Sequence, residues 1–266
     1  PPTGIEISTS DGTDFVPMSP LSIEPVDGVI PATVIFARFA PIEVKEYVGS
    51  IRHETEITSV NKFTYGRGTH PTPKVQASHI TFTNISAHTA EISWTHGDAE
   101  RRAVFMKEGA ISDAEPMQYI GYSPSNNWVA KGSEIAGTGY FCIYNGTNPD
   151  ASTTAIEVFN LQPGTSYSVY VFEYNGINGE QNYLINTDNA PDNPASFETL
   201  PTGLEISTDD EMMENYLDGV VIELNILNEE FVDEHLDPIN FELRDKPPGV
   251  YIDGITYIDA NTATLT

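Results

Sequence analysis

Short runs of β-branched and aromatic residues, each bounded by glycine, proline, asparagine or aspartate, recur along the whole chain and limit its fold to strands. In the run 90–95, apolar and polar residues alternate, which places Ala90, Ile92 and Trp94 on one face of a strand. Helical periodicity is scarce, and we expect a short helix only over 210–217. The sequence therefore predicts an all-β chain of tandem antiparallel β-sandwiches. The expected strands are 4–8, 19–24, 32–39, 46–52, 58–65, 78–84, 90–95, 102–107, 140–144, 155–160, 166–174, 195–199, 220–227, 240–244, 249–257 and 262–265.

Two proline-containing stretches indicate linkers between domains. They are His70-Pro71-Thr72-Pro73 and Leu200-Pro201-Thr202-Gly203. A residue that precedes proline avoids the helical conformation, so such stretches form extended spacers. We therefore predict three domains, at 1–71, 72–200 and 201–266. The two flanking segments are short for complete sandwiches, and we expect each to be part of a domain.

A short sequence is repeated near the start of the two flanking segments. Residues 2–9 read Pro-Thr-Gly-Ile-Glu-Ile-Ser-Thr, and residues 201–208 read Pro-Thr-Gly-Leu-Glu-Ile-Ser-Thr. The two sequences diverge afterwards, which indicates a shared entry into a domain rather than a full repeat.

The charge of the chain excludes two classes of partner. There are 12 basic and 39 acidic residues, a net charge of −27, and no lysine or arginine lies between Lys131 and Arg244. Nucleic acid and anionic membrane surfaces both require clustered basic residues, so we expect neither as a partner. No apolar run approaches the roughly 20 residues of a membrane-spanning helix, so we expect no membrane insertion.

The acidic residues leave two interpretations open. One is a solvated acidic surface suited to a saline medium. The other is Ca²⁺ bound in loops or at domain junctions, with no other cofactor required. No acidic cluster follows the alternating pattern of an EF-hand loop. The candidate metal ligands are Asp188, Asp192, Asp209 and Asp210.

The middle third resembles a fibronectin type III module. Trp94 lies on an early strand, and Leu161-Gln162-Pro163-Gly164-Thr165-Ser166-Tyr167 leads into a later one. A proline–glycine turn followed by tyrosine is typical of a tyrosine corner, in which the hydroxyl bonds to the upstream backbone. The resemblance covers residues 74–200, with an insertion at about 110–139. It implies structural roles for Trp94, Leu161, Pro163, Gly164 and Tyr167.

The flanking segments resemble other secreted modules. Residues 2–68, through segments such as Ile35–Pro41, look like the greater part of an immunoglobulin-like sandwich. Residues 201–266, through segments such as Leu236–Phe241, are similar to an acidic β-rich surface repeat. Such modules occur in strings in large secreted proteins of Bacteroidetes-type bacteria. The resemblance implies an extracellular or cell-surface location, beside neighbouring domains of the same longer chain.

The sequence contains no recognisable catalytic pattern. The six histidines lack metal-ligand spacing, and both the Gly-x-Ser-x-Gly motif and glycine-rich phosphate loops are missing. Cys142 lies in the alternating run 140–144 and is predicted to be a small core residue. We therefore expect a chain that is not an enzyme.

The insertion is the expected place for binding. Its aromatic residues could form a flat platform for a glycan or a surface protein, or they could instead cover a sheet edge or fill the core. Two functions follow as hypotheses. The first is a noncatalytic stalk or adhesin segment of a large extracellular protein, and the alternative is a set of accessory carbohydrate- or protein-binding modules of a secreted multidomain enzyme. The candidate ligand-binding residues are Tyr119, Tyr122, Trp128 and Tyr140.

Overall fold

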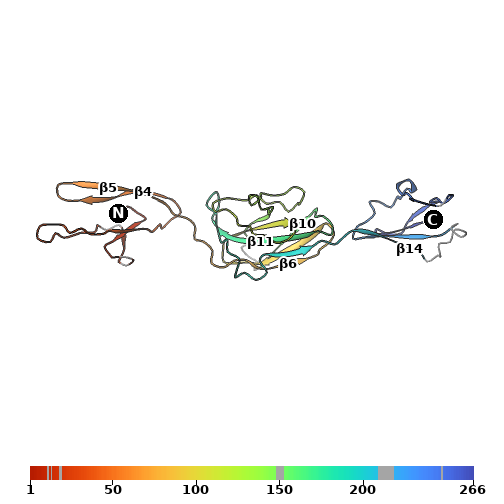
Figure 1. Ribbon diagram of the computed structural model, residues 1–266, viewed down its shortest axis with the longest axis horizontal. Helices are drawn as coiled ribbons and strands as arrows, with labels where there is room; N and C mark the ends of the chain where they lie inside the picture. Colours follow the sequence, from red (N-terminus) through yellow and green to blue (C-terminus); the bar gives the residue numbers. More distant parts are fainter. Residues whose placement is uncertain (11, 13, 18–19, 148–152, 209–218, 247) are drawn as a thin grey trace. The chain divides into compact units, whose positions relative to one another are not determined.

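The computed structural model covers residues 1–266 and describes all of them except 11, 13, 18–19, 148–152, 209–218 and 247 (Figure 1). The described residues form an all-β fold, as predicted, and their strands form five antiparallel sheets. The expected helix over 210–217 lies outside the described residues.

The chain divides into two compact units. The first consists of residues 1–72 together with 175–182, and the second consists of residues 73–174 and 183–266. The division after residue 72 falls within the predicted linker 70–73. The boundary predicted near residue 201 lies inside the second unit and stays a prediction.

A three-stranded sheet in the first unit is centred on β1 (Ile5–Ser8). This strand pairs with β2 (Val16–Pro17) on one side and with β3 (Phe36–Phe39) on the other. Ile5 and Ile7, which share one face of β1, are both buried. On the other face, Glu6 is half-buried, and Ser8 at the end of the strand is buried as well.

A two-stranded hairpin completes the first unit. It consists of β4 (Glu46–Glu54) and β5 (Ser59–Arg67). The ring of Tyr47 in β4 is buried, and it lies so close to Gly4 that a Cβ there would meet it at 2.4 Å. Gly4 also has a φ of +81°, so both its conformation and its contact with Tyr47 require glycine.

The second unit contains two sheets whose side chains meet in one core. The strand order is β10-β7-β6 in one sheet and β12-β11-β8-β9 in the other, with β13 also beside β11. Figure 1 shows β6, β10 and β11 in this part of the chain. The strands are β6 (Ser78–Thr83), β7 (Thr89–Thr95), β8 (Arg101–Glu108), β9 (Phe141–Gly146), β10 (Thr153–Phe159), β11 (Ser166–Asn175), β12 (Asn182–Tyr183) and β13 (Ala195–Glu198).

We call the cluster between these two sheets the shared core. All of its members are buried, and both sheets contribute to it. Trp94 of β7 and Val171 of β11 are examples from the two sides. The members are Ala77, Ile80, Ala90, Ile92, Trp94, Val104, Met106, Trp128, Ile143, Val158, Leu161, Tyr167, Val169, Val171 and Phe197.

The sheet that contains β8, β9 and β11 is covered on its other face as well. There a second cluster, which we call the outer core, joins alternate residues of these strands to residues of the predicted insertion at 110–139. Coverage of both faces explains why β8 contains the unbroken apolar run 103–106. The members of the outer core are Ala103, Phe105, Ala114, Tyr122, Ile135, Tyr140, Cys142, Tyr170, Phe172, Tyr174 and Tyr183.

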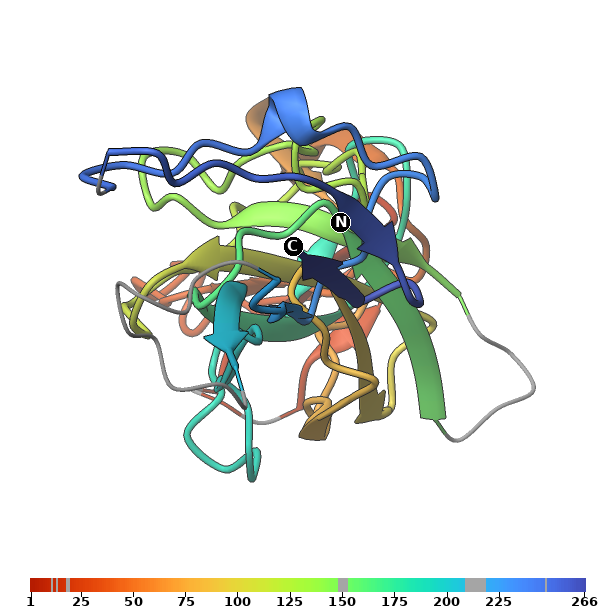
Figure 2. The same cartoon turned by 90° about the vertical axis from the view of Figure 1, so that its right-hand side faces the viewer.

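The last part of the chain forms a four-stranded sheet in the order β14-β15-β17-β16. Its strands are β14 (Gly203–Ser207), β15 (Ile222–Leu227), β16 (Ile255–Tyr257) and β17 (Thr262–Leu265). A single turn of 3₁₀ helix, η2 (Pro238–Asn240), lies between β15 and β16 and is the blue coil at the top of Figure 2.

Two of the expected strands are wrong. The described residues of 19–24 are irregular, because Pro20 and Pro25 have no N–H to donate to a ladder. Residues 241–244 are irregular because the chain turns just before them: the Asp237 side chain accepts a hydrogen bond from the backbone N–H of Ile239 and caps η2.

Candidate functional site

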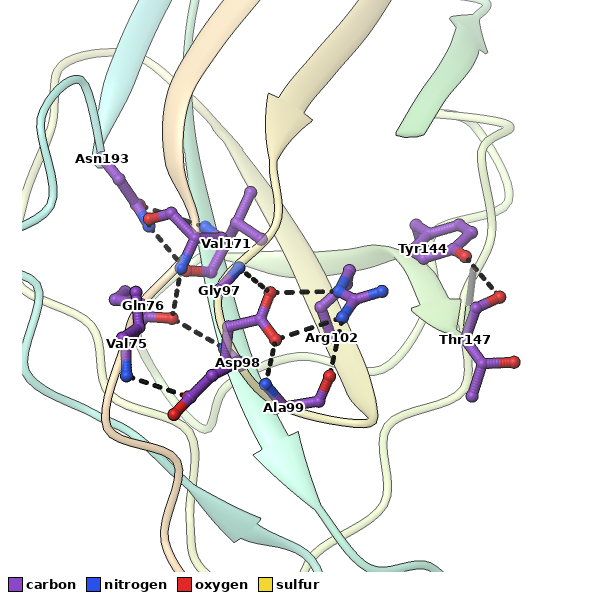
Figure 3. A network of polar contacts seen from close by, with 12 residues as sticks. Val75, Gln76, Gly97, Asp98, Ala99, Arg102, Tyr144, Thr147, Val171 and Asn193 are labelled. Atoms are coloured by element: carbon purple, nitrogen blue, oxygen red, sulfur yellow. Dashed lines mark hydrogen bonds and ion pairs between the residues drawn. The ribbon is translucent and has the colours of Figure 1, made fainter. Parts of the chain in front are cut away.

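Arg102 and Glu173 form a buried ion pair where the chain enters the two middle sheets. The Nε and Nη2 atoms of Arg102 donate to the two carboxylate oxygens of Glu173 at 3.0 and 3.2 Å, and the side chains are 3% and 0% exposed. The same carboxylate accepts the backbone N–H groups of Gly97 at 3.0 Å and Ala99 at 3.3 Å. In Figure 3, dashed lines from Arg102, Gly97 and Ala99 meet at one unlabelled carboxylate, and these hydrogen bonds identify it as that of Glu173. This two-point geometry, with the added backbone donors, offsets the cost of removing two charges from water.

Gln76 connects the incoming chain to this ion pair. Its side-chain oxygen accepts the backbone N–H of Glu173 at 2.7 Å, and its side-chain nitrogen donates to the carbonyl of Leu184 at 2.6 Å. One residue earlier, the carboxylate of Asp98 accepts the N–H of Val75 at 2.9 Å. The chain is therefore held by side chains before β6 begins.

Asn193 adds a third attachment at the same end. Its amide nitrogen donates to the carbonyls of Ala77 at 2.8 Å and Val171 at 2.7 Å, and its amide oxygen accepts the N–H of Val171 at 3.2 Å. Asn193 is buried, so these bonds replace the water contacts that its amide loses. They connect the start of β6 to the interior of β11.

Tyr167 and Thr199 hold the chain where it leaves the middle sheets. The Tyr167 hydroxyl accepts the N–H of Gln162 at 2.9 Å, which is the geometry of a tyrosine corner. The Thr199 hydroxyl donates to the carbonyl of Gln162 at 2.6 Å and accepts the N–H of Thr165 at 2.9 Å. Gly164 forms the turn with a φ of +55°.

Entrance and exit lie at opposite ends of β11. Glu173, which contacts the incoming residues, is near the last residue of this strand, whereas Thr165 directly precedes its first residue. A strand of ten residues spans about 30 Å at roughly 3.3 Å per residue. The chain therefore crosses the middle sheets from one end to the other.

The aromatic residues predicted to bind a ligand do not form an exposed platform. Tyr122 and Tyr140 are buried in the outer core, and Trp128 is buried in the shared core. Their rings exclude water from the two faces of a sheet, so no sugar can stack on them while the cores are closed. Tyr119 alone of the four is substantially exposed.

The loop that carries Tyr119 is held rigidly. The side chain of Gln118 exchanges two hydrogen bonds with the backbone of Tyr183, at 2.9 and 2.7 Å. The Tyr183 hydroxyl donates to the carbonyl of Ile120 at 3.0 Å, and the Tyr122 hydroxyl accepts the N–H of Met117 at 3.0 Å. Tyr119 itself has a φ of +66°, a conformation that is strained for a non-glycine residue.

The predicted metal ligands do not come together in the described part of the chain. Asp188 and Asp192 are exposed, and no group of three or more metal-ligating side chains is found among the described residues. Asp209 and Asp210 lie outside those residues.

Cys142 is a core residue. It is buried in the outer core, and its thiol donates to the carbonyl of Tyr144 at 3.3 Å. Burial raises the pKa of Cys142 to about 12, so its thiol is protonated near neutral pH. A protonated, buried thiol is a poor nucleophile.

The sequence did not identify the polar residues that hold the two ends of the middle sheets. Glu173 is the only charged residue in the stretch 167–174 of β11, and every residue of that stretch is buried. A single carboxylate in a buried stretch indicates a buried partner of opposite charge, and this pattern in the sequence could have identified Glu173. Nothing in the sequence identifies Arg102, which lies 71 positions away, as that partner.

No protein-family model matches the chain, and no curated protein matches it either. The described residues contain no helix that is long and apolar enough to cross a membrane. A function is therefore inferred from the two attached ends of the middle sheets.

Proposed function

We propose that the chain is a noncatalytic segment of a large extracellular or surface-attached bacterial protein, in which tandem β-sandwich modules act as stalk or adhesin repeats. The observation that carries this proposal is the position of the entrance and the exit at opposite ends of β11. Modules crossed from end to end can be joined in series, and neighbouring domains of the same chain are then their first partners.

The strands at the two ends are placed to resist tension. β6 runs away from the entrance and pairs with β7, and β13 runs towards the exit and pairs with β11. Tension along the chain would pull both strands along their own axes. Since antiparallel hydrogen bonds lie perpendicular to the strands, such a pull loads the bonds of a ladder together.

The details of the middle sheets support a fibronectin type III-like sandwich for residues 74–200. Trp94 and Leu161 are buried in the shared core, and the hydrogen bond from Gln162 to Tyr167 closes the corner. The interpretation of residues 1–71 as part of an immunoglobulin-like sandwich, and of residues 201–266 as an acidic surface repeat, belongs to the same proposal.

Force spectroscopy on the full chain tests the stalk role. Handles attached through T72C and T202C pull from end to end, whereas handles attached through T165C and T202C peel β13 from β11 at one end. We expect a clearly higher unfolding force in the first geometry, because its hydrogen bonds break together. Equal forces in the two geometries would contradict a load-bearing role.

Accessory binding modules of a secreted enzyme are the second candidate, and the exposed, rigidly held Tyr119 favours them. A glycan array tests this function with the Tyr119→Ala variant, because the exposed ring can be removed without opening a core. Trp128→Ala is unsuited to the test, since loss of a buried tryptophan costs about 3–5 kcal/mol. Glycan binding that disappears in Tyr119→Ala supports this candidate, and an array without binding refutes it.

A further inference from the structure

The hairpin of β4 and β5, labelled in Figure 1, has one covered face. Tyr47, Gly49 and Gly66 share this face, and the ring of Tyr47 is buried. A Cβ on Gly49 would meet the Pro2 side chain at 2.5 Å, and a Cβ on Gly66 would meet the Phe39 ring at 2.7 Å. This face therefore packs closely on the sheet that contains β1 and β3.

The opposite face of the hairpin is exposed and has an apolar centre. Val48 lies directly opposite Tyr65, and Phe63 is the next residue of β5 on the same face. Val48, Tyr65 and Phe63 are 61%, 63% and 64% exposed. Large apolar side chains that gather on one exposed face indicate a contact with another molecule. A two-stranded hairpin is only marginally stable by itself, so such a contact would also stabilise the hairpin.

The charges on this exposed face cancel each other. Glu46 and Arg67 lie opposite each other at one end of the apolar centre, and Arg52 and Glu54 follow each other on the same face at the other end. The face is therefore neutral, although the chain has a net charge of −27. At physiological ionic strength, exposed charges more than about 8 Å apart are largely screened. Two copies that met at this face would thus avoid most of the repulsion between their acidic surfaces.

The pattern of this face is complementary to itself. Two hairpins that pack face to face about a two-fold axis through the apolar centre have that axis either across the strands or along them. An axis across the strands brings Glu46 of one copy to Arg52 of the other, and an axis along the strands brings it to Arg67 of the other. In both arrangements an acidic residue meets a basic one, and symmetry makes the contact occur twice.

We propose that the exposed face of the β4–β5 hairpin is a contact between two copies of the chain. Val48, Phe63 and Tyr65 of both copies form its apolar centre, and Glu46 of each copy pairs with an arginine of the other. The charge complementarity of the face with itself favours a second copy over an unrelated protein. The apolar centre is small, so the dimer is weak and forms at high protein concentration. This interaction surface does not depend on the proposed stalk function.

Sedimentation equilibrium of the full chain tests the contact. The unaltered chain should show a monomer–dimer equilibrium, and Phe63→Lys should abolish the dimer because it places a charge in the apolar centre of both copies. Phe63 is 64% exposed, so this change leaves the covered face of the hairpin intact, and the circular dichroism of the chain should not change. A chain that stays monomeric at every concentration would overturn the proposal, and so would a dimer that Phe63→Lys leaves unchanged.

A charge reversal tests the pairing between the two copies. Glu46→Arg makes the chain less negative, so net charge alone would favour association, whereas the proposed pairing predicts a dissociation constant about tenfold higher. Glu115→Arg, the same charge change on an exposed residue of the insertion, should not weaken the dimer. Adding either Arg52→Glu or Arg67→Glu to Glu46→Arg should restore it, and the variant that does so identifies the direction of the two-fold axis. Restoration by neither, or equal weakening by Glu115→Arg, would overturn the proposal.

Discussion

The ion pair between Arg102 and Glu173 permits a sharp test of how the middle sheets are held together. We consider three variants of the full chain: Arg102→Met, Glu173→Met and the double variant. The two side chains are almost fully buried and bond to each other at two points. Each single change therefore leaves one charge in the interior without its partner.

The expected magnitudes follow from the contacts. Loss of one partner of a buried ion pair costs about 3–5 kcal/mol in the free energy of unfolding, so the two single changes sum to about 6–10 kcal/mol. The double variant leaves no buried charge, but the N–H groups of Gly97 and Ala99 lose their acceptor. Each unpaired donor costs about 1–3 kcal/mol, and both residues are partly accessible to water, so we expect a total of about 2–4 kcal/mol.

Tryptophan fluorescence during urea unfolding measures these differences selectively. The chain has two tryptophans, Trp94 and Trp128, and both lie in the shared core. With a dependence of about 2 kcal/mol per molar urea, a loss of 4 kcal/mol lowers the midpoint by about 2 M. The signal reports the middle sheets because neither flanking segment contains tryptophan.

The coupling between the two changes decides the outcome. We expect the double variant to be no less stable than either single variant. If the single changes each cost less than about 1 kcal/mol, or if the double variant loses the sum of both, the pair is not the buried, mutually dependent contact described above.

Three further predictions concern single contacts. Burial raises the pKa of Cys142 to about 12, above the 9.0 of a free thiol, so the folded state favours the protonated form. The melting temperature should therefore fall as the pH rises from 9 towards 12, and Cys142→Ala should reduce that fall. Tyr167→Phe removes the acceptor for the Gln162 N–H and should lower the free energy of unfolding in urea by about 1 kcal/mol. An unchanged midpoint would contradict a stabilising role for the tyrosine corner. The hydrogen bond to Glu229 raises the pKa of His88. The stability that this contact contributes is therefore fully present below pH 6.5 and is lost as the pH rises through the raised pKa of His88. An NMR titration should show a lower pKa for His88 in the Glu229→Gln variant.

Short runs of β-branched and aromatic residues predicted most of the strands, because such side chains pack well on the pleated surface of a sheet. The expected strand 166–174 corresponds to β11 (Ser166–Asn175), and 90–95 corresponds to β7 (Thr89–Thr95). The pattern failed over 240–244, where a side chain caps a helical turn just upstream. It also passed over β14 (Gly203–Ser207), although the repeated octapeptide marked the same residues.

The candidate ligand-binding residues show that a strand pattern does not determine whether a face of the sheet is covered by another segment. A sequence pattern places Tyr140 next to a strand, but it does not say what lies over that face of the sheet. The unbroken apolar run 103–106 in β8 indicates that both faces are covered, and the insertion is the segment that covers the second face. With this signal, Tyr122 and Tyr140 would have been assigned to a core.

The two copies of the octapeptide separate what a local sequence determines from what its neighbours determine. The same alternation makes a strand of β1 and of β14, so strand formation follows from the residues themselves. Burial does not, because Ile7 is covered while Ile206 is open. The difference comes from segments distant in sequence: β3 places Arg38 opposite Glu6, and Tyr47 of β4 packs on Gly4.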